Sequence, residues 1–545
     1  MSAIKRTARE NAADMVEKKL SDKTKMNYRG RIKALKMWIS EHEEKPISDL
    51  YNTENDELTL PLPVPVLLEF FGYIGNVSEE GDQYKAVSTV GGFRSAIVDL
   101  YKSHRISNMF PSDEISDFIS GYKRNIADEK LAGHVTLQEG KRAVTFESYR
   151  KLAQLATSAA TSASQYINMT LFMLLCWNLM CRSISTANLM YTHMTWIGDA
   201  LVVNLPKTKG DQEGTKSYPK HVYANPHDPS ICAILHLGLK IVSSHKLSHQ
   251  ENAVFPGGSA ESKFSKWLRD LLCGLCESVL LTLGFTVQEF GTHSFRKGAA
   301  TYAQSKNGGP SLIAIYHRAG WSIGNVQQRY IFPTEGGDQM VGRILCGLPW
   351  GDDRYCALPP QFIVSTLSDD DWELIVSGYK NYPACFKCAI PYLIASVVYH
   401  REWLSSTLPS SHPYFKSRLY TSGILNRLAD MVVLPHNYCE ETKMCATGIP
   451  ETLLISQRVA AMSNAVENLG EAIMINEENS VARTERVLNE LPKLVVDDML
   501  RKVHVEGNTT HSGRFPSGYC GKSYLHQKHD SGVFIRTSNS NSNIQ

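Results

Sequence analysis

The stretch GTHSFRKGAAT, residues 291–301, places a histidine and an arginine three positions apart, and RAGWSIGNVQQRYIF, residues 318–332, adds a tryptophan and a tyrosine nine positions apart. Core packing has no need of His293 or Arg296, and a metal site would not recruit Arg296 or an aromatic side chain. The fork of arginine matches a phosphate, and histidine and indole N–H groups can donate to the remaining phosphate oxygens. A tyrosine hydroxyl can act as a nucleophile. The pattern therefore predicts attack on a phosphodiester by Tyr330 in a site that uses no metal.

A site of this kind requires a second cation and a proton donor for the leaving oxygen, and the chain contains candidates for both. Arg182 follows the apolar run LFMLLCWNLM, residues 171–180. Lys207 and Lys209 lie in the polar stretch KTKGDQEG, between two segments that read as strands. A lysine on such a hairpin can reach into a site and loses a proton more readily than arginine does. Either lysine could be the acid, and Lys207, which is nearer the strand, is our choice.

The chain resembles the tyrosine recombinase (phage integrase) family, whose catalytic residue types occur here in the family's order: Arg182, a hairpin lysine, His293, Arg296, Trp321 and Tyr330. The resemblance covers about residues 145–345. The sequence AGWS at 319–322 stands where many members have Leu-Gly-His-Ser, and Cre-type members also have tryptophan there. The segments KGDQEG, HVYANP, HSFRKGAAT and RAGWSIG are most similar to the recombinases of Crypton-type eukaryotic mobile elements. One position departs from the pattern: many members carry an acid three residues after the first arginine, and Ser185 occupies that place.

The resemblance implies DNA cleavage and rejoining through a 3′-phosphotyrosyl intermediate, as in site-specific recombination, integration or transposition. Tyr330 would be the nucleophile, and the phosphate would be held by Arg182, His293, Arg296 and Trp321. His293 could also accept the tyrosine proton, and Lys207 would protonate the leaving 5′-oxygen. No cofactor and no metal are expected. The expected partners are double-stranded DNA and further copies of the chain, as a dimer or tetramer on DNA.

Two other functions remain open. A recombinase kept as a catalytically silent DNA-binding regulator would retain the fold, although a binding module has no use for a nucleophile. A topoisomerase of similar chemistry would relax DNA without pairing two sites. Taken singly, His293 could be a structural histidine, Arg296 a surface ion-pair partner and Trp321 a core residue.

The expected fold is mainly α with a small antiparallel β-sheet, comprising an N-terminal helical core-binding domain and a catalytic domain. Apolar periodicity predicts helices at 23–42, 64–77, 86–104 and 112–129, with Ser112 as an N-cap. Short strands are expected in TWI, ALVVNL and KSYPKHVY, with a turn at Gly198-Asp199. The expected domains are a helical DNA clamp at 1–127, a linker at 128–144, the catalytic domain at 145–349, a helical region without a readable role at 350–505 and a disordered tail at 506–545.

The charge of this 545-residue chain is unevenly distributed, although its formal net charge is only +2. Residues 1–36 contain eleven lysines and arginines against four acids, whereas residues 451–500 contain nine acids against four bases. A basic head fits a protein that holds nucleic acid at one end. The expected DNA-binding residues are Lys23, Lys25, Arg29, Arg31, Lys33, Lys36 and Lys209.

No run approaches the roughly 18 consecutive apolar residues of a membrane span. The N-terminus has no apolar stretch behind its charges, as a secretory signal would. We therefore expect a soluble intracellular protein without a membrane partner, nuclear if the source is eukaryotic and cytoplasmic otherwise.

The sequence also contains two pairs of closely spaced cysteines and one heptad pattern. Cys273 and Cys276 lie in an apolar helical stretch and are expected to be buried thiols, and a zinc site at Cys385 and Cys388 is the less favoured interpretation of the second pair. Apolar residues between 455 and 473 recur at 4-3-4-3-4 spacing, as in a coiled-coil seam. That seam could be internal packing or a contact between two copies, and internal packing is the favoured alternative.

Overall fold

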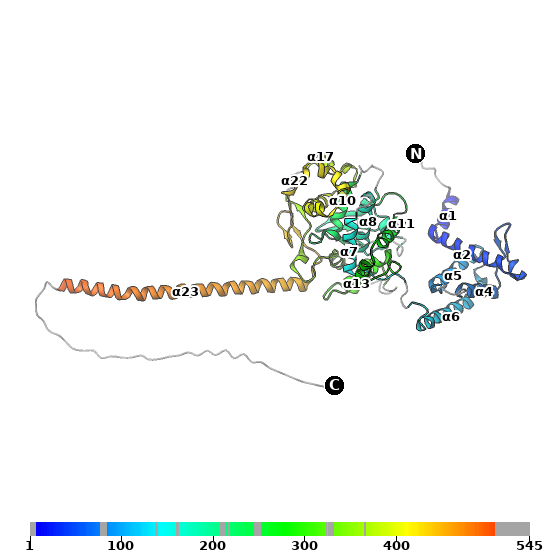
Figure 1. The fold of residues 1–545 in the computed structure, drawn as a ribbon, viewed down its shortest axis with the longest axis horizontal. Coiled ribbons are helices and arrows are strands. Elements are labelled where there is room, and N and C mark those ends of the chain that lie inside the picture. Colours follow the sequence, from blue (N-terminus) through cyan, green and yellow to red (C-terminus); the bar gives the residue numbers. More distant parts are fainter. Residues whose placement is uncertain are drawn as a thin grey trace, which may run out of the picture. The chain divides into compact units, whose positions relative to one another are not determined.

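The computed structural model describes residues 7–76, 84–136, 140–159, 163–207, 211, 213–214, 218–244, 252–322, 324, 332–363 and 367–506. This part of the chain is mainly helical with small antiparallel sheets, which confirms the predicted fold class (Figure 1). It divides into two compact units, Met1–Ile449 and Pro450–Gln545, which are taken in turn.

The N-terminal segment is a helical bundle with a small hairpin. Buried apolar side chains on facing helices, among them Leu35, Phe70, Phe71 and Tyr101, form its core. Helices occur at all four predicted places, because each has apolar residues at helical spacing on one face. The elements are α1 (Ala8–Glu17), α2 (Asp22–Glu41), α3 (Lys45–Ser48), β1 (Tyr51–Asn52), β2 (Glu57–Leu58), α4 (Val64–Gly75), α5 (Val87–Ser103), η1 (Ser107–Met109) and α6 (Ser112–Leu131).

The predicted N-cap of α6 is wrong by one position. Ser112 is the first residue of the helix, and Pro111 occupies the cap position without a side-chain hydrogen bond. The Ser112 hydroxyl instead accepts a hydrogen bond from the Arg94 guanidinium at 3.2 Å. A contact with α5 therefore uses the group that local preference assigns to capping.

The central part of the first unit surrounds α8, which is buried over most of its described side chains because it is apolar on all sides. A three-stranded antiparallel sheet in the order β3-β4-β5 lies at its end, and Gly198 adopts a φ of +58° in the predicted turn. The elements are α7 (Phe146–Ser158), α8 (Ala163–Asn178), α9 (Ser183–Ala187), η2 (Tyr191–His193), β3 (Met194–Ile197), β4 (Ala200–Val203), β5 (Lys220–Val222), η3 (Pro229–Ile231), α10 (Ala233–Ser243), α11 (Ala260–Cys273), α12 (Glu277–Leu283), α13 (Thr292–Gln304), α14 (Leu312–Ala319) and α16 (Glu335–Leu345).

Residues 353–449 belong to the same compact unit as these helices. Helix α19 lies so close to α10 that a Cβ at Gly238 would stand 2.5 Å from the Leu393 carbonyl oxygen. The elements are η4 (Asp353–Cys356), β6 (Gln361–Phe362), α17 (Asp369–Ile375), η5 (Tyr379–Asn381), α18 (Ala384–Lys387), α19 (Ile390–Tyr399), α20 (Arg401–Thr407), η6 (Pro413–Lys416), α21 (Arg418–Thr421), α22 (Ile424–Ala429), β7 (Val432–Val433), β8 (Tyr438–Cys439) and β9 (Met444–Cys445).

A network of buried polar groups also connects this C-terminal part to the rest of the first unit. Arg343, fully buried on α16, forms an ion pair with Asp199 and donates to the carbonyls of Tyr355 and Ala357. Asp199 in turn accepts from the backbone N–H and the hydroxyl of Thr447, at 3.0 and 2.7 Å. A buried charge pair needs such additional hydrogen bonds, and these join three distant parts of the chain.

The expected burial of Cys273 and Cys276 is wrong. Both thiols are exposed, because Cys273 is the last residue of α11 and Cys276 directly precedes α12. Within the described ranges no cluster of histidine, cysteine or acidic residues has the makings of a metal site. Cys388 instead accepts a hydrogen bond from the backbone N–H of Trp196 at 3.3 Å, which links α18 to β3.

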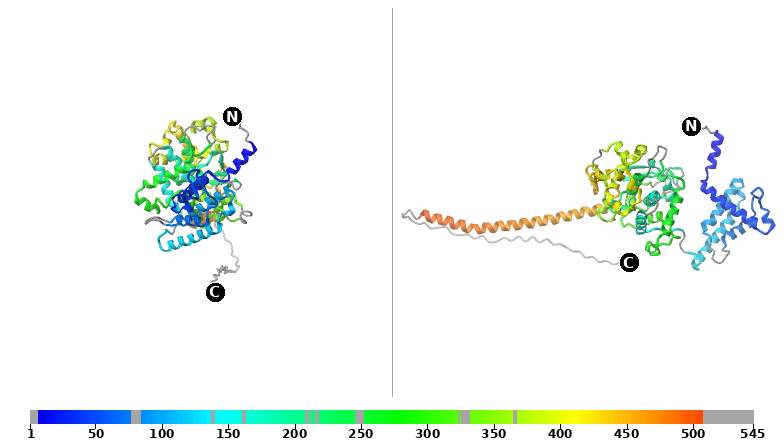
Figure 2. Two further views of the ribbon diagram at one scale, coloured as in Figure 1. Left: turned by 90° about the vertical axis from the view of Figure 1, so that its right-hand side faces the viewer. Right: turned by 45° about the horizontal axis from the view of Figure 1, so that its top comes forward.

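The described part of the second unit is one long helix, α23 (Glu451–Glu506), which runs without a break (Figures 1 and 2). The predicted disordered tail lies almost wholly outside the described residues, since only Glu506 of it is described. In the part of the chain covered by the structure, no helix has both the length and the apolar character to cross a membrane.

Candidate active site

Four of the predicted catalytic residues come from the ends of helices in the first unit. Arg182 occupies the N-cap position of α9, just after the buried helix α8. His293 and Arg296 lie in the first two turns of α13, and their i, i+3 spacing makes them neighbours on the helix surface. Trp321 follows α14, whose C-cap Gly320 has a left-handed φ of +64°. A glycine accommodates that conformation without a Cβ penalty and turns the chain toward the site.

Arg296 is the buried cation of this group, with 7% of its surface exposed. Its guanidinium donates to the Ala319 carbonyl and lies 5.5 Å from the ring centroid of Trp321. Burial, with the neighbouring Arg182 charge, lowers the pKa of Arg296 to about 10. The group still carries its charge near neutral pH, so two cations lie close together here.

His293 lies in the field of both arginines. Partial burial, followed by the charges of Arg296 and Arg182, lowers the pKa of its imidazole, and only Glu261 acts in the opposite sense. A histidine with a lowered pKa is mostly neutral near pH 7 and can accept a proton.

No carboxylate forms an ion pair with Arg182 or Arg296 among the residues that the structure describes. Glu261 is bound instead by the Ser183 hydroxyl at 3.3 Å. Two arginines without a carboxylate partner repel each other, and an anion between them would relieve that repulsion. The geometry therefore fits a phosphate, which two guanidinium groups can hold through charge-assisted hydrogen bonds.

Ser185, where many tyrosine recombinases carry an acid, is buried, and its backbone N–H donates to the Arg182 carbonyl at 2.8 Å. This i→i−3 backbone hydrogen bond closes the first turn of α9, so it does not support the Arg182 guanidinium. The turn that precedes Arg182 is held by other residues, which the sequence did not reveal.

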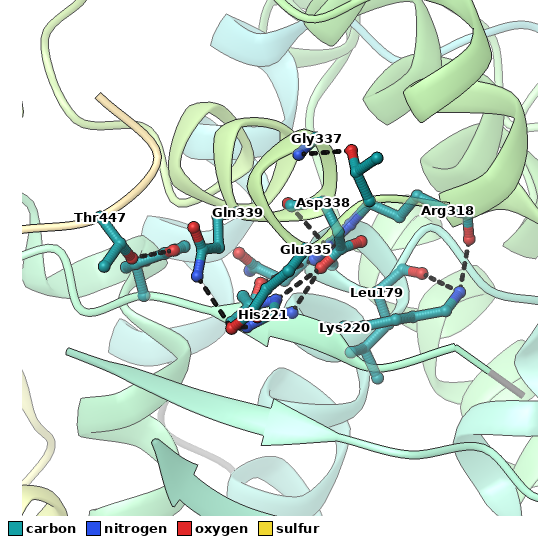
Figure 3. Close-up of polar contacts among 12 residues, drawn as sticks. Leu179, Lys220, His221, Arg318, Glu335, Gly337, Asp338, Gln339 and Thr447 are labelled. Atoms are coloured by element: carbon teal, nitrogen blue, oxygen red, sulfur yellow. Dashed lines mark hydrogen bonds and ion pairs between the residues drawn. The ribbon is translucent and has the colours of Figure 1, made fainter. Parts of the chain in front are cut away.

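Lys220 on β5 is one of these supporting residues (Figure 3). Its ammonium group donates to the carbonyls of Leu179 and Arg318, and burial lowers its pKa to about 8. The first carbonyl lies three residues before Arg182, and the second lies three residues before Trp321. Lys220 therefore joins the turns that carry these two side chains.

Arg318 is the second supporting residue, and its side chain is fully buried. It forms an ion pair with Asp338 at 2.6 Å and donates to the carbonyls of Asn178 and His221 at 2.7 and 2.8 Å (Figure 3). Asp338 also accepts from His221 at 2.9 Å. The partners are 20 to 140 positions apart, so no local spacing could have indicated them. The sequence signal for Lys220 was weak, because β5 reads Lys-His-Val and its burial depends on the fold.

Of the remaining predicted catalytic residues, only Lys207 lies within the described ranges. Lys207 follows β4 and is exposed, and within the described ranges no hydrogen bond or ion pair joins it to Arg182, His293 or Arg296. Lys209 and Tyr330 lie outside the described residues.

The predicted DNA-binding residues of the N-terminal segment lie on α2. Lys25 forms ion pairs with Glu17 and Asp22, at 3.4 and 3.8 Å, and Lys36 forms one with Asp56 at 2.8 Å. Arg31 lies over the ring of Phe93 at 5.9 Å, on the side of the helix that faces α5. The residues of this set with exposed side chains are Lys23, Arg29 and Lys33.

A hollow of about 610 Å³ opens beside His293. Its lining includes Lys141, Arg269 and Thr292, so two further cations share this hollow with His293. Such a basic lining suits a polyanion that continues beyond a single phosphate.

No family model and no curated protein matches the chain. One similar solved structure is that of the XerH site-specific recombinase bound to difH substrate, in a pre-cleavage complex. It is 16% identical to this chain, covers 55% of it and 72% of its own length, and has a TM-score of 0.32. This distant neighbour is a site-specific recombinase.

Proposed function

We propose that this protein cleaves and rejoins DNA as a tyrosine recombinase, with Tyr330 as the nucleophile. The observation that carries the proposal is the arginine pair Arg182 and Arg296. The two charges lie close together without a carboxylate partner among the described residues, next to a histidine with a lowered pKa. A structural role would pair or separate these charges, whereas binding of a scissile phosphate requires them unpaired.

In the proposed reaction the Tyr330 oxygen attacks the phosphorus of a DNA phosphodiester, and its proton passes to His293. The bond from phosphorus to the 5′-oxygen breaks, and that oxygen takes a proton from Lys207, or from Lys209. The product is a 3′-phosphotyrosyl bond and a free 5′-hydroxyl. A 5′-hydroxyl of a partner strand then attacks the same phosphorus and releases Tyr330. The linkage conserves the energy of the original bond, so the reaction needs no ATP.

The wider organisation is proposed on the same basis. The bundle within residues 1–127 would hold the duplex through the exposed cations of α2, and residues 145–349 would carry the chemistry, with 128–144 joining them. Recombination of two sites would require paired protomers on DNA. The sequence motifs favour an enzyme of the Crypton type, which would act in a nucleus on integration or transposition of its element.

The test is covalent trapping on DNA. A free tyrosine has a pKa of about 10 and is barely ionised at neutral pH, so attack requires the cations and proton acceptor of this site. The full chain is incubated, in EDTA, with a nicked duplex of a binding site selected from random sequences, so that the 5′ fragment diffuses away. The unmodified protein should form an adduct that survives denaturation, and Tyr330→Phe should bind the same DNA without forming one.

Two tyrosines serve as matched controls. Tyr302 is stacked on Phe146 with ring centroids 4.3 Å apart, and burial raises its pKa. Tyr316 packs edge-on against Trp321 at 5.3 Å. Tyr302→Phe and Tyr316→Phe should both still trap. An adduct with Tyr330→Phe would identify a different nucleophile, and no adduct from the unmodified chain would favour the DNA-binding regulator.

A further inference from the structure

Helix α23 exposes an apolar seam, the residues at 4-3-4-3-4 spacing between positions 455 and 473. Between 51% and 69% of the surface of each of these residues is exposed. Within the described part of the second unit, which is the helix α23 alone, no other segment covers the seam. Its members are Ile455, Val459, Met462, Val466, Leu469 and Ile473.

An exposed seam of this kind is unfavourable in water. Most helices in proteins are stabilised by burying an apolar face, and an isolated helix is only marginally stable. The seam runs for about 27 Å at 1.5 Å per residue. Removing its surface from water is the main favourable contribution that the seam can make to keeping this segment helical.

The side chains of the seam favour one kind of partner. In a heptad labelled abcdefg, the a positions hold the β-branched residues Val459, Val466 and Ile473. The d positions hold Ile455, Met462 and Leu469, of which the last two are not branched at Cβ. β-branched residues at a with leucine-like residues at d favour two parallel strands. The seam thus matches a second copy of itself in the same direction and register.

The positions that flank the seam allow close approach. Most e and g residues are small and uncharged, and Arg458 at g would face Ser463 at e of the second copy. No like charges would therefore oppose each other across a parallel pair. The flanking residues are Ser456, Arg458, Ser463, Ala465, Gly470 and Ala472.

The surface available is sufficient for a stable pair. If each of the twelve seam side chains loses about 100 Å² of exposed surface, the pair buries about 1,200 Å², the lower end of the range for specific protein interfaces. Beyond Ile473 the same register puts Asn476, Arg483 and Glu490 at d. Polar and like-charged residues would meet there, so the apolar seam ends at Ile473.

We propose that two copies of this chain pair through residues 455–473 of α23, as a parallel, in-register, two-stranded coiled coil that forms without DNA. The pairing does not depend on the proposed cleavage reaction. It supplies a constitutive dimer, whereas pairing on DNA alone would leave the free protein monomeric.

The first experiment measures the mass of the full chain in solution without DNA, by light scattering at micromolar concentration. The unmodified protein should have twice the chain mass of 60.9 kDa. The double variant Val459→Asp with Val466→Asp puts charges at successive a positions and should have the mass of one chain. The control Asn464→Asp with Asn468→Asp adds the same charges on the opposite face of the helix and should remain a dimer.

Circular dichroism of the full chain checks that the seam variant has lost its partner rather than its fold, since the remaining helices should keep their signal. A monomeric unmodified protein would overturn the proposal. So would a seam variant that keeps the doubled mass, or a control variant that loses it.

A second experiment tests the direction of the pair by oxidative cross-linking. Met462→Cys and Leu469→Cys, made separately, should each give a cross-linked dimer above the background of the native cysteines, because only a parallel, in-register pair brings both positions next to their own copies. Asn464→Cys, on the outer face, should not. Cross-linking at only one of the two d positions would contradict the parallel arrangement.

Discussion

Burial, followed by the charge of the neighbouring Arg182, lowers the pKa of Arg296. Such an arrangement is costly in the free protein and becomes favourable when an anion lies between the two groups. This is the behaviour expected of a site that stabilises charge as it develops on a phosphate. The free-energy cost of this repulsion is confined to the site, because Lys220 and Arg318 stabilise the surrounding turns by donating hydrogen bonds to backbone carbonyls.

The first prediction concerns these two arginines. Replacing either Arg182 or Arg296 with alanine should slow DNA cleavage by about 10²–10³-fold, because each removes a charged donor to the transition state. Binding to long DNA should change much less, since other phosphate contacts remain. The measurements are adduct formation over time and binding by fluorescence anisotropy. Arg150→Ala, which removes an exposed arginine paired with Asp228, is the matched control and should leave cleavage unchanged.

Equal losses of cleavage and binding in the Arg182 and Arg296 variants would contradict a role at the scissile phosphate. They would point to misfolding or to a general contribution to DNA affinity.

At the scale of the element, helix α2 presents basic residues on a side next to its buried face. Lys25, Arg29, Lys33 and Lys36 recur at spacings of 4, 4 and 3, which places them along one stripe. Lys25 and Lys36 are held by carboxylates, whereas Arg29 and Lys33 have exposed side chains. The stripe therefore contains cations that differ in their availability to DNA.

The second prediction uses that difference. Replacing Arg29 and Lys33 with glutamine should reduce the slope of log binding constant against log salt by about 1.8, at about 0.9 for each lost phosphate contact. The matched double variant, Lys25→Gln with Lys36→Gln, removes the same charge from residues that already have acidic partners and should change the slope less. Titrations at several salt concentrations measure both. An unchanged slope in the first variant would exclude α2 from the DNA interface.

Three histidines at the junction of α10 with residues 400–412 give the third prediction. Burial lowers the pKa of His236, of His400 and of His412 to about 4 each. The unfolded chain takes up these protons near the ordinary histidine pKa of about 6.5, whereas the folded chain resists them down to about 4. Stability should thus be complete above about pH 6.5 and fall as the pH drops toward 4, by roughly 1.4 kcal/mol per pH unit for each group.

Denaturant unfolding at a series of pH values tests this expectation. His412→Asn keeps an acceptor for the Tyr414 backbone N–H, which His412 binds at 3.1 Å, but removes the titrating ring. This variant should lose stability less steeply with acid than the unmodified protein. His134→Asn, at an exposed position, should leave the steepness unchanged. The same steepness in all three proteins would show that other groups control the acid response.

The elements that could be predicted from the sequence are those with a strong local period. Four helices of the bundle, the apolar α8 and the Gly198 turn follow directly from spacing and residue type. The exposed thiol of Cys273 could not be predicted, because it depends on where α11 ends. The length of α23 could not be predicted from the sequence either, since the apolar period weakens after Ile473.

The candidate site shows the same division. The order of motifs indicated Arg182, His293 and Arg296 as neighbours, and the structure brings them together with Trp321. Lys220 could not be found in this way, because its partners are carbonyls, which every residue type carries. Supporting contacts of this kind depend on the fold and leave no pattern in side-chain spacing.

At the scale of the molecule, the chain divides at Ile449, and this division gives the fourth prediction. Every described residue of the candidate site lies in the first unit, whereas the apolar seam lies in the second. Removing residues 450–545 should therefore leave a protein that unfolds cooperatively, near the temperature of the corresponding transition in the full chain. It should also form the covalent adduct on a single nicked duplex at an unchanged rate, because that reaction uses one protomer.

The truncated protein should, however, have the mass of one chain in light scattering. Its affinity for DNA carrying two sites should fall, because the second binding event loses its effective concentration. A truncated protein that binds DNA but forms no adduct would show that the second unit takes part in the chemistry, and a truncated protein that remains dimeric would place the pairing surface in the first unit.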